Sequence, residues 1–136
     1  MVGANFSSLM SLTKRNLPLP FGNINNKRSF LGIDNLTQLI EICIEHEEAK
    51  NQIFLASDDN DISTTELIKL MKKVQRKQFL LFPLPSFLLN YAAKLIGKKY
   101  IFERLFGDLQ VNIEHTKSTL QWEPKSSLEE TLKKMV

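Results

Sequence analysis

The stretch LPLPFGNINNKRSFLGIDNL, residues 17–36, carries the signals that decide how this chain folds. Pro18 and Pro20 cannot continue a helix, so they end any helix that precedes them and keep the chain extended. Gly22–Asn26 has the composition of a turn. Arg28 then opens the apolar run RSFLGI, which predicts a short strand. An aromatic residue and a guanidinium group therefore stand on either side of a polar loop that is expected to be flexible.

Apolar residues recur at helical spacing on both sides of this stretch, and polar residues mark where the helices should begin. Asn5, Asp34 and Ser86 are expected to cap helices, because their side chains can accept from the free amides of a first turn. Two S-x-x-E patterns predict capping boxes, at Ser63 to Glu66 and at Ser126 to Glu129. Shorter helices are expected near residues 100–106 and from residue 112.

Few segments have the pattern of strands. Besides RSFLGI, the apolar runs Asn51–Ser57 and Phe79–Pro85 are bounded by turn residues, and residues 109–111 are expected to be extended. The predicted fold class is therefore α/β and helix-rich, with a few short strands. These strands are too few for an independent doubly wound sheet.

Length and composition set broad limits. The 136 residues suffice for one domain, or for one piece of a larger protein. A hydrophobic fraction of 43% and a charged fraction of 24% are ordinary for a globular chain, and the formal charge of +3 suits an anionic ligand. The single cysteine, Cys43, excludes a disulfide framework and favours a reducing compartment.

Neither the N-terminal segment nor the most apolar window of the sequence indicates a membrane segment. The N-terminus lacks a basic segment followed by a long apolar run and a cleavage site, so no signal peptide is expected. The most apolar window, Phe79–Ile96, is interrupted by two prolines, Asn90 and Lys94. A membrane span needs about 20 mostly apolar residues. The window is instead interpreted as a strand, a turn and a buried helix.

The chain offers little catalytic chemistry. Its five glycines, at positions 3, 22, 32, 97 and 107, do not have the spacing of a dinucleotide or phosphate loop. His46 and His115 have no partner at metal-ligand spacing, and Cys43 lies in an apolar helical pattern. Tyr91 and Lys94 are three residues apart in an apolar helix and are not interpreted as a catalytic pair. We therefore predict no catalytic residue and no metal site within these residues.

The basic run Lys69–Lys77 raises the alternative of nucleic-acid binding. Its charges are assigned to the outward face of a helix whose inward face holds Leu70, Met71 and Val74. No aromatic residues are interleaved with these charges to stack on bases. A solvated face is the preferred interpretation.

The opening stretch has features that suit a nucleotide diphosphate. Phe21 follows two prolines that stiffen its approach, so its ring and the adjacent backbone could be presented to a pyrimidine. Arg28 supplies a planar fork that matches phosphate oxygens. Asn5 lies where helix amides and the positive end of the helix dipole would favour an anion, and Arg104 precedes the break at Gly107. Two arginines converging on one diphosphate would make a strong site.

Four segments, in order, resemble the C-terminal, substrate-binding part of the extended short-chain dehydrogenase/reductase family, the NAD-dependent epimerases and dehydratases of nucleotide sugars. They are GANFSSLM, LPLPFG, KRSFLGIDNL and ERLFGDLQVNIEHTKSTLQWEPKSSLEETL. The last contains the K-x-x-x-L-x-W-x-P pattern at residues 117–124. The resemblance covers nearly all of the chain, but only about the last two-fifths of an intact enzyme.

The resemblance implies roles for particular residues. Asn5 and the backbone of Phe6 would contact the diphosphate, Leu19 and Phe21 would lie at the uracil base, Arg28 and Arg104 would bind phosphate, and Asp34 would cap a helix. Residues 1–136 would form one nucleotide-sugar-binding domain. The NAD-binding Rossmann domain, with its glycine-rich loop, catalytic Ser/Thr and Tyr-x-x-x-Lys pair, is not among them.

The resemblance also implies a function for the parent enzyme: NAD-dependent oxidation at C4 of a sugar carried by UDP, by a 4-epimerase, dehydratase or 4-keto reductase, in bacterial polysaccharide synthesis. By itself the chain would bind a UDP sugar weakly, hold no NAD and turn nothing over. We expect a bacterial cytoplasmic location, the Rossmann half as a partner, self-association through exposed apolar surface, and neither nucleic acid nor membrane as a partner. The alternatives are a protein-interaction or regulatory module on the same fold and, less favoured, a basic nucleic-acid-binding domain.

Overall fold

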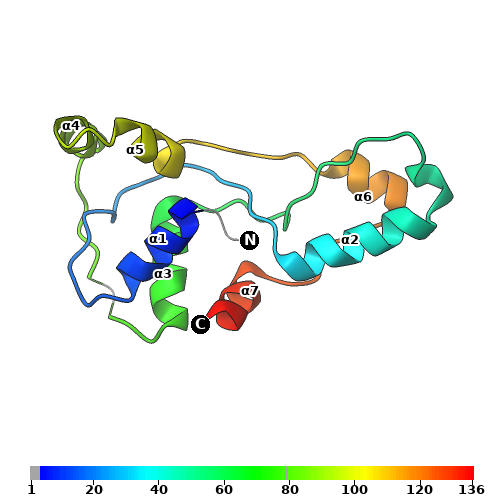
Figure 1. Ribbon diagram of the computed structural model, residues 1–136, viewed down its shortest axis with the longest axis horizontal. Coiled ribbons are helices and arrows are strands. Elements are labelled where there is room, and N and C mark those ends of the chain that lie inside the picture. Colours follow the sequence, from blue (N-terminus) through cyan, green and yellow to red (C-terminus); the bar gives the residue numbers. More distant parts are fainter. Residues whose placement is uncertain (1–3, 79) are drawn as a thin grey trace. The chain divides into compact units, whose positions relative to one another are not determined.

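The computed structural model describes residues 4–78 and 80–136, without the side chains at positions 4, 5, 101, 102 and 105. The chain divides into two compact units (Figure 1). Unit 1 comprises residues 1–28 and 62–108, with Val136, and unit 2 comprises residues 29–61 and 109–135. The predicted helix-rich class is confirmed, because helices account for most of the regular structure in the described residues.

The helices alternate with irregular segments in both units. Unit 1 contains α1 (Ala4–Thr13), α3 (Thr64–Val74), α4 (Ser86–Leu95) and α5 (Lys99–Phe106). Unit 2 contains α2 (Ile33–Glu45), the short 3₁₀ helix η1 (Glu47–Ala49), α6 (Glu114–Leu120) and α7 (Leu128–Met135).

The expected strands do not form a sheet in the described residues. Pairing is limited to two isolated bridges, a parallel one between Leu19 and Leu81 and an antiparallel one between Arg28 and Ile62. Prolines flank Leu19 and follow Phe82, and a proline has no N–H to donate to a ladder. The pairing therefore stops after one bridge at the first site.

Unit 1 is built on the packing of α1 against α3 (Figure 1). Leu9 and Met10 of α1 are buried, as are Leu67, Ile68 and Met71 of α3. Gln75, which caps α3, donates from Nε2 to the Met10 carbonyl at 3.3 Å. The Met10 carbonyl, near the end of α1, thus has a hydrogen-bond donor from the end of α3.

The start of α3 has the capping box that the sequence predicts, but one lysine of this helix is not on the outward face where it was expected. Ser63 Oγ accepts from the Glu66 amide and Glu66 Oε2 accepts from the Ser63 amide, which completes the predicted capping box. Lys72, however, was assigned to the outward charged face and is fully buried. Its Nζ donates to the Gln78 carbonyl at 3.2 Å. The aliphatic stem of a lysine can be buried when its ammonium group reaches an acceptor, and charge alone did not reveal this.

Unit 2 has its own apolar core. Leu39 of α2 lies in one cluster with Ile113, Leu120 and Trp122, and partly buried residues of the 42–56 segment pack against it. Trp122 is only 1% exposed. The tryptophan of the K-x-x-x-L-x-W-x-P pattern is thus a central part of this core.

The cap of α2 differs from the prediction. Its N-cap residue is Gly32, and Asp34 lies inside the first turn, where its carboxylate pairs with Lys134. The capping acceptor comes from Asp58, whose Oδ1 accepts from the Gly32 amide at 2.9 Å and from Asn35 Nδ2 at 2.7 Å. A carboxylate at this end of α2 also suits the helix dipole.

The second capping box is shifted by one residue from the prediction. Ser127 Oγ accepts from the Glu130 amide, and Glu130 Oε2 accepts from the Ser127 amide. Asn35 fixes the preceding backbone, because its Oδ1 accepts from the amides of Lys125 and Ser126. Since the Ser126 amide is held by Asn35, α7 begins only at Leu128.

The helix predicted to be buried, α4, is largely exposed. Only Leu89 and Ala93 of α4 are buried. Its N-cap residue is Pro85, so Ser86 is the first helical residue and not the predicted cap. The helix ends before Gly97, which has a φ of +70°. Within the described residues, no helix is both long and apolar enough to cross a bilayer.

A candidate nucleotide-binding site at the end of α5

The polar loop at residues 21–27 is held in place by α3. Thr65, in the first turn of α3, donates from Oγ1 to the Phe21 carbonyl at 2.6 Å. The same oxygen accepts from the Ile24 amide at 2.9 Å, and Ile24 is buried. One hydroxyl thus joins both ends of the turn that the sequence predicts at Gly22. The loop was predicted to be flexible, but these bonds fix its conformation.

Asn26 connects this loop to two helix ends. Its Oδ1 accepts from the Thr64 amide of α3 at 2.7 Å, and its Nδ2 donates to the Gly107 carbonyl after α5 at 3.0 Å. Asn26 is 9% exposed. The side chain therefore satisfies a free amide at the start of α3 and a free carbonyl at the end of α5.

Arg28 lies against the same end of α5. Its Nη1 donates to the Arg104 carbonyl at 2.7 Å and to the Gly107 carbonyl at 3.0 Å. A cation at a helix C-terminus is favoured by the helix dipole and by unpaired carbonyls. The backbone of Arg28 is fixed as well, because it exchanges two hydrogen bonds with Ile62, both at 3.0 Å.

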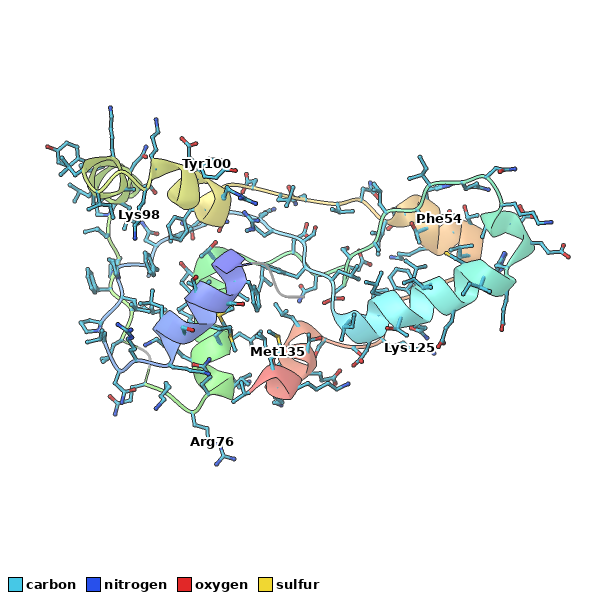
Figure 2. The ribbon with its side chains drawn as sticks, viewed as in Figure 1. Phe54, Arg76, Lys98, Tyr100, Lys125 and Met135 are labelled. Atoms are coloured by element: carbon cyan, nitrogen blue, oxygen red, sulfur yellow. The ribbon has the colours of Figure 1, made fainter. Side chains whose placement is uncertain are left out.

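The second arginine projects from α5 itself. The guanidinium carbon of Arg104 lies 5.3 Å from the centre of the Tyr100 ring, and its Nη1 lies 3.3 Å from the Tyr100 hydroxyl. Both residues are exposed; Figure 2 labels Tyr100 on α5. The contact with an aromatic ring orients this guanidinium and leaves its charge accessible to an anion.

Phe21 also contacts the end of α5. Its ring centre lies 5.3 Å from that of Phe106, with the two ring planes inclined at 41°. Gly22, the next residue, is packed so closely on the backbone of Phe82 that an added Cβ would lie 2.8 Å from the Phe82 carbonyl carbon. Phe21 and Arg28 thus contact the end of α5, the helix that carries Arg104.

The other predicted site residues are Leu19, Phe6 and Asn5, all of which precede the polar loop in the sequence. Leu19 is buried, its amide donates to the Leu80 carbonyl and its carbonyl accepts from the Phe82 amide. Its backbone is therefore already paired within unit 1. Phe6 is half-buried on α1. Asn5 falls within α1 and not before it, and its side chain lies outside the described residues. The predicted contacts of Asn5 and Phe6 with a diphosphate stay predictions.

The residues that organise the site were not predicted from the sequence. Asn26 and Thr65 fix the loop, and Tyr100 and Phe106 orient Arg104 and Phe21. The spacing of Tyr100 and Arg104, four residues apart on a helix, was the one signal available. The contacts of Asn26 and Thr65 join residues far apart in sequence, which no local pattern indicates.

The two arginines give this site a positive charge, which suits an anion. The described residues contain no group of three or more histidine, cysteine or acidic residues that could hold a metal ion. The glycines beside the site serve local packing: an added Cβ at Gly22 or Gly107 would meet the backbone of Phe82 or Glu103 within 3 Å.

No protein-family model matches the chain. A UDP-glucose 4-epimerase from Vibrio cholerae, however, is 47% identical to it over 133 residues, which is 97% of this chain and 40% of that enzyme. This chain is homologous to part of a UDP-glucose 4-epimerase. The predicted resemblance is thereby confirmed, and the chain spans about two-fifths of the length of the epimerase that it matches.

The fold agrees with this relationship. A crystal structure of UDP-glucose 4-epimerase with UDP-glucose, from the hyperthermophilic eubacterium Thermotoga maritima, covers 97% of this chain with a TM-score of 0.61 and 21% identity. The match takes in 37% of that epimerase chain. The helix-rich 136 residues correspond to a C-terminal part of an epimerase and do not include its Rossmann half.

Proposed function

We propose that this chain is the nucleotide-sugar-binding portion of an NAD-dependent epimerase of the extended short-chain dehydrogenase/reductase family, and that its ligand is a UDP sugar. One observation carries the proposal: Phe21 and Arg28, from other segments, both contact the C-terminal turn of α5, the helix from which Arg104 projects. An aromatic face suits a uracil ring, and two guanidinium groups suit a diphosphate. The V. cholerae relative acts on a UDP sugar by name, which supports this choice of ligand.

In this proposal the residues have distinct roles. The guanidinium of Arg104 is exposed and binds the diphosphate directly. Arg28 shapes the end of α5 with Nη1, and its remaining N–H groups face the phosphates. Phe21 and the Leu19 segment form the wall beside the base, and Asn5 with the Phe6 backbone completes the anion site at the start of α1. Residues 1–136 act together as one substrate-binding domain.

The chemistry of the sugar is assigned to the Rossmann half of the parent enzyme. NAD bound to that half would supply the oxidising chemistry at C4 of the sugar, and the residues of this chain would hold the UDP group. The present residues supply no glycine-rich loop and no Tyr-x-x-x-Lys pair. We infer that the chain alone binds no NAD and does not turn over substrate, and that the parent serves polysaccharide synthesis in the cytoplasm.

Isothermal titration with UDP, UMP and ADP tests the proposal. UDP should bind more tightly than UMP, because a second phosphate adds charge-assisted hydrogen bonds to the guanidinium groups. Arg104→Gln should weaken UDP binding by about tenfold to a hundredfold, as expected for a hydrogen bond to a charged group. Arg76→Gln, which removes an exposed arginine after α3, is the matched control and should leave the affinity unchanged. Equal affinities for UDP in wild type and Arg104→Gln would contradict the assignment.

A further inference from the structure

Helix α4 is apolar on two opposite faces. Leu89 and Ala93 are buried against unit 1, whereas Phe87, Tyr91 and Leu95 are 71%, 62% and 69% exposed. At about 100° per residue, the three exposed residues lie within one narrow stripe, roughly opposite the two buried ones. Leu88, 41% exposed, widens the stripe. The exposed stripe is a continuous apolar patch of a kind that marks an interaction surface.

The charges around this patch have one sign. Residues 78–102 contain three lysines, Lys94, Lys98 and Lys99, and no aspartate or glutamate. All three lysines are exposed. Figure 2 labels Lys98, between α4 and α5, together with Tyr100 on α5. Lys99 is paired with Glu103 at 3.8 Å, so Lys94 and Lys98 carry the net positive charge of this surface.

A second exposed apolar face provides a contrast. Ile40 and Ile44 of α2 are 50% and 79% exposed, and the acidic residues Glu41 and Glu45 lie beside them. This face is aliphatic and acidic, whereas the α4 face is partly aromatic and basic. The two faces therefore suit partners of different chemistry.

We propose that the exposed face of α4, formed by Phe87, Leu88, Tyr91 and Leu95 with Lys94 and Lys98, docks on an anionic lipid surface. A helix with an apolar aromatic stripe and flanking lysines lies in the plane of a membrane interface, its apolar side chains in the acyl boundary and its ammonium groups among the headgroups. This is surface binding and not a span, consistent with the helix lengths. It departs from the expectation that no membrane is a partner.

Charge argues against a second copy of the chain as the occupant of this face. A two-fold interface between copies would place the same patch against itself and would bring Lys94 and Lys98 close to their own counterparts. Lysine is also depleted at the centres of protein–protein interfaces. An anionic bilayer removes both difficulties, because each lysine near its surface improves binding by about fivefold.

Vesicle flotation of the full chain tests this proposal. With phosphatidylcholine vesicles containing about 30% phosphatidylglycerol, the bound fraction should be high at low salt and should fall as salt screens the lysines. Phe87→Ser with Leu95→Ser should lower binding at least tenfold, and Lys94→Gln with Lys98→Gln should lower it on anionic vesicles only. Ile40→Ser with Ile44→Ser, the matched change on α2, should leave binding unchanged.

The lysine variant keeps the test decisive if the apolar variant folds poorly, because exposed lysines do not contribute to the core. Circular dichroism verifies the fold of each variant. Three results would overturn the proposal. The wild-type chain could fail to bind anionic vesicles, or the α2 variant could lose as much vesicle binding as the α4 variant. In the third, the wild-type chain binds no vesicles and is a dimer by light scattering, and the apolar α4 variant is a monomer. The last result would assign the face to a second copy of the chain. None of these residues belongs to the proposed UDP site, so the outcome is separate from the nucleotide titration.

Discussion

The guanidinium of Arg28 holds the backbone of the other arginine of the site, donating to the Arg104 carbonyl at 2.7 Å. The residues are 76 positions apart in the sequence, yet one of them closes the helix from which the other projects. The Arg28 guanidinium therefore supports the helix that carries Arg104, and a change at Arg28 should also alter the position of Arg104.

Replacing Arg28 by leucine should lower the free energy of unfolding by about 1–2 kcal/mol, because two carbonyls at the end of α5 lose a charged donor. Thermal unfolding followed by circular dichroism measures the change. Lys27→Leu, which removes the exposed basic side chain of the preceding residue, is the control and should stay within about 0.5 kcal/mol of wild type. Equal stabilities for Arg28→Leu and wild type would show that the contact with α5 does not form in solution.

Asn26 allows a sharper comparison with its neighbour Asn25. Asn26→Ala removes hydrogen bonds to the Thr64 amide and the Gly107 carbonyl, and the Thr64 residue is buried. An unsatisfied buried amide costs about 1–3 kcal/mol, so this variant should lose that much stability. Asn25 is exposed and bonds only to the Asn23 side chain, so Asn25→Ala should be close to neutral. Denaturant unfolding of both variants decides the matter, and similar losses would contradict the role of Asn26.

These polar contacts explain why the turn at residues 22–26 was predictable and its anchoring was not. Glycine and asparagine indicate a turn through their own backbone preferences. The two partners of Asn26, Thr64 and Gly107, lie 38 and 81 positions further along the chain. A local pattern contains no information about such pairs, so the loop was taken to be flexible.

The same distinction applies to the helix caps. Ser63 and Glu66 are three residues apart and their capping box was predicted correctly. At α2 the acceptor is Asp58, which approaches from a different segment and displaces Asp34 from the predicted role. At α7 two S-x-x-E registers were available, and contacts with Asn35 select the later one.

Asp58 and Asp34 can be tested against each other. Asp58→Ala should destabilise the chain by about 1–2 kcal/mol, because the Gly32 amide and the Asn35 side chain lose their common acceptor. Asp34→Ala should cost at most about 0.5–1 kcal/mol, because its pair with Lys134 is exposed. Hydrogen exchange of the first-turn amides of α2 would detect the loss locally. A larger loss from Asp34→Ala would restore Asp34 as the cap.

The buried lysine of α3 gives an opposite prediction. Lys72→Met replaces an ammonium group that has lost its hydration by an apolar chain of similar length, while the exposed Gln78 residue can hydrate its carbonyl. We expect Lys72→Met to be neutral or more stable by about 1 kcal/mol, with Lys69→Met, an exposed lysine on the same helix, as control. A loss of more than 1–2 kcal/mol in thermal unfolding would show that the bond to Gln78 is required.

Exposure was the feature that the sequence predicted least well. Residues 86–95 are apolar on both helix faces, and this pattern alone does not show whether both faces are covered by protein. The sequence therefore predicts a buried helix, whereas one face of α4 is exposed. Lys72 is the converse case, a charged residue that the fold encloses. Hydrophobicity indicates which residues leave water, but the surrounding elements decide which of them are covered.

The most direct measurement of the central claim is a UDP titration of the ¹⁵N-labelled chain, followed by its amide resonances. If the end of α5 binds the nucleotide, the amides of Phe21, Arg28 and Arg104 should shift together with one dissociation constant, and Arg104→Gln should weaken that constant. If these amides do not move while others shift, or if UDP shifts none of the resonances at millimolar concentration, the aromatic ring and the two guanidinium groups do not form a uridine diphosphate site.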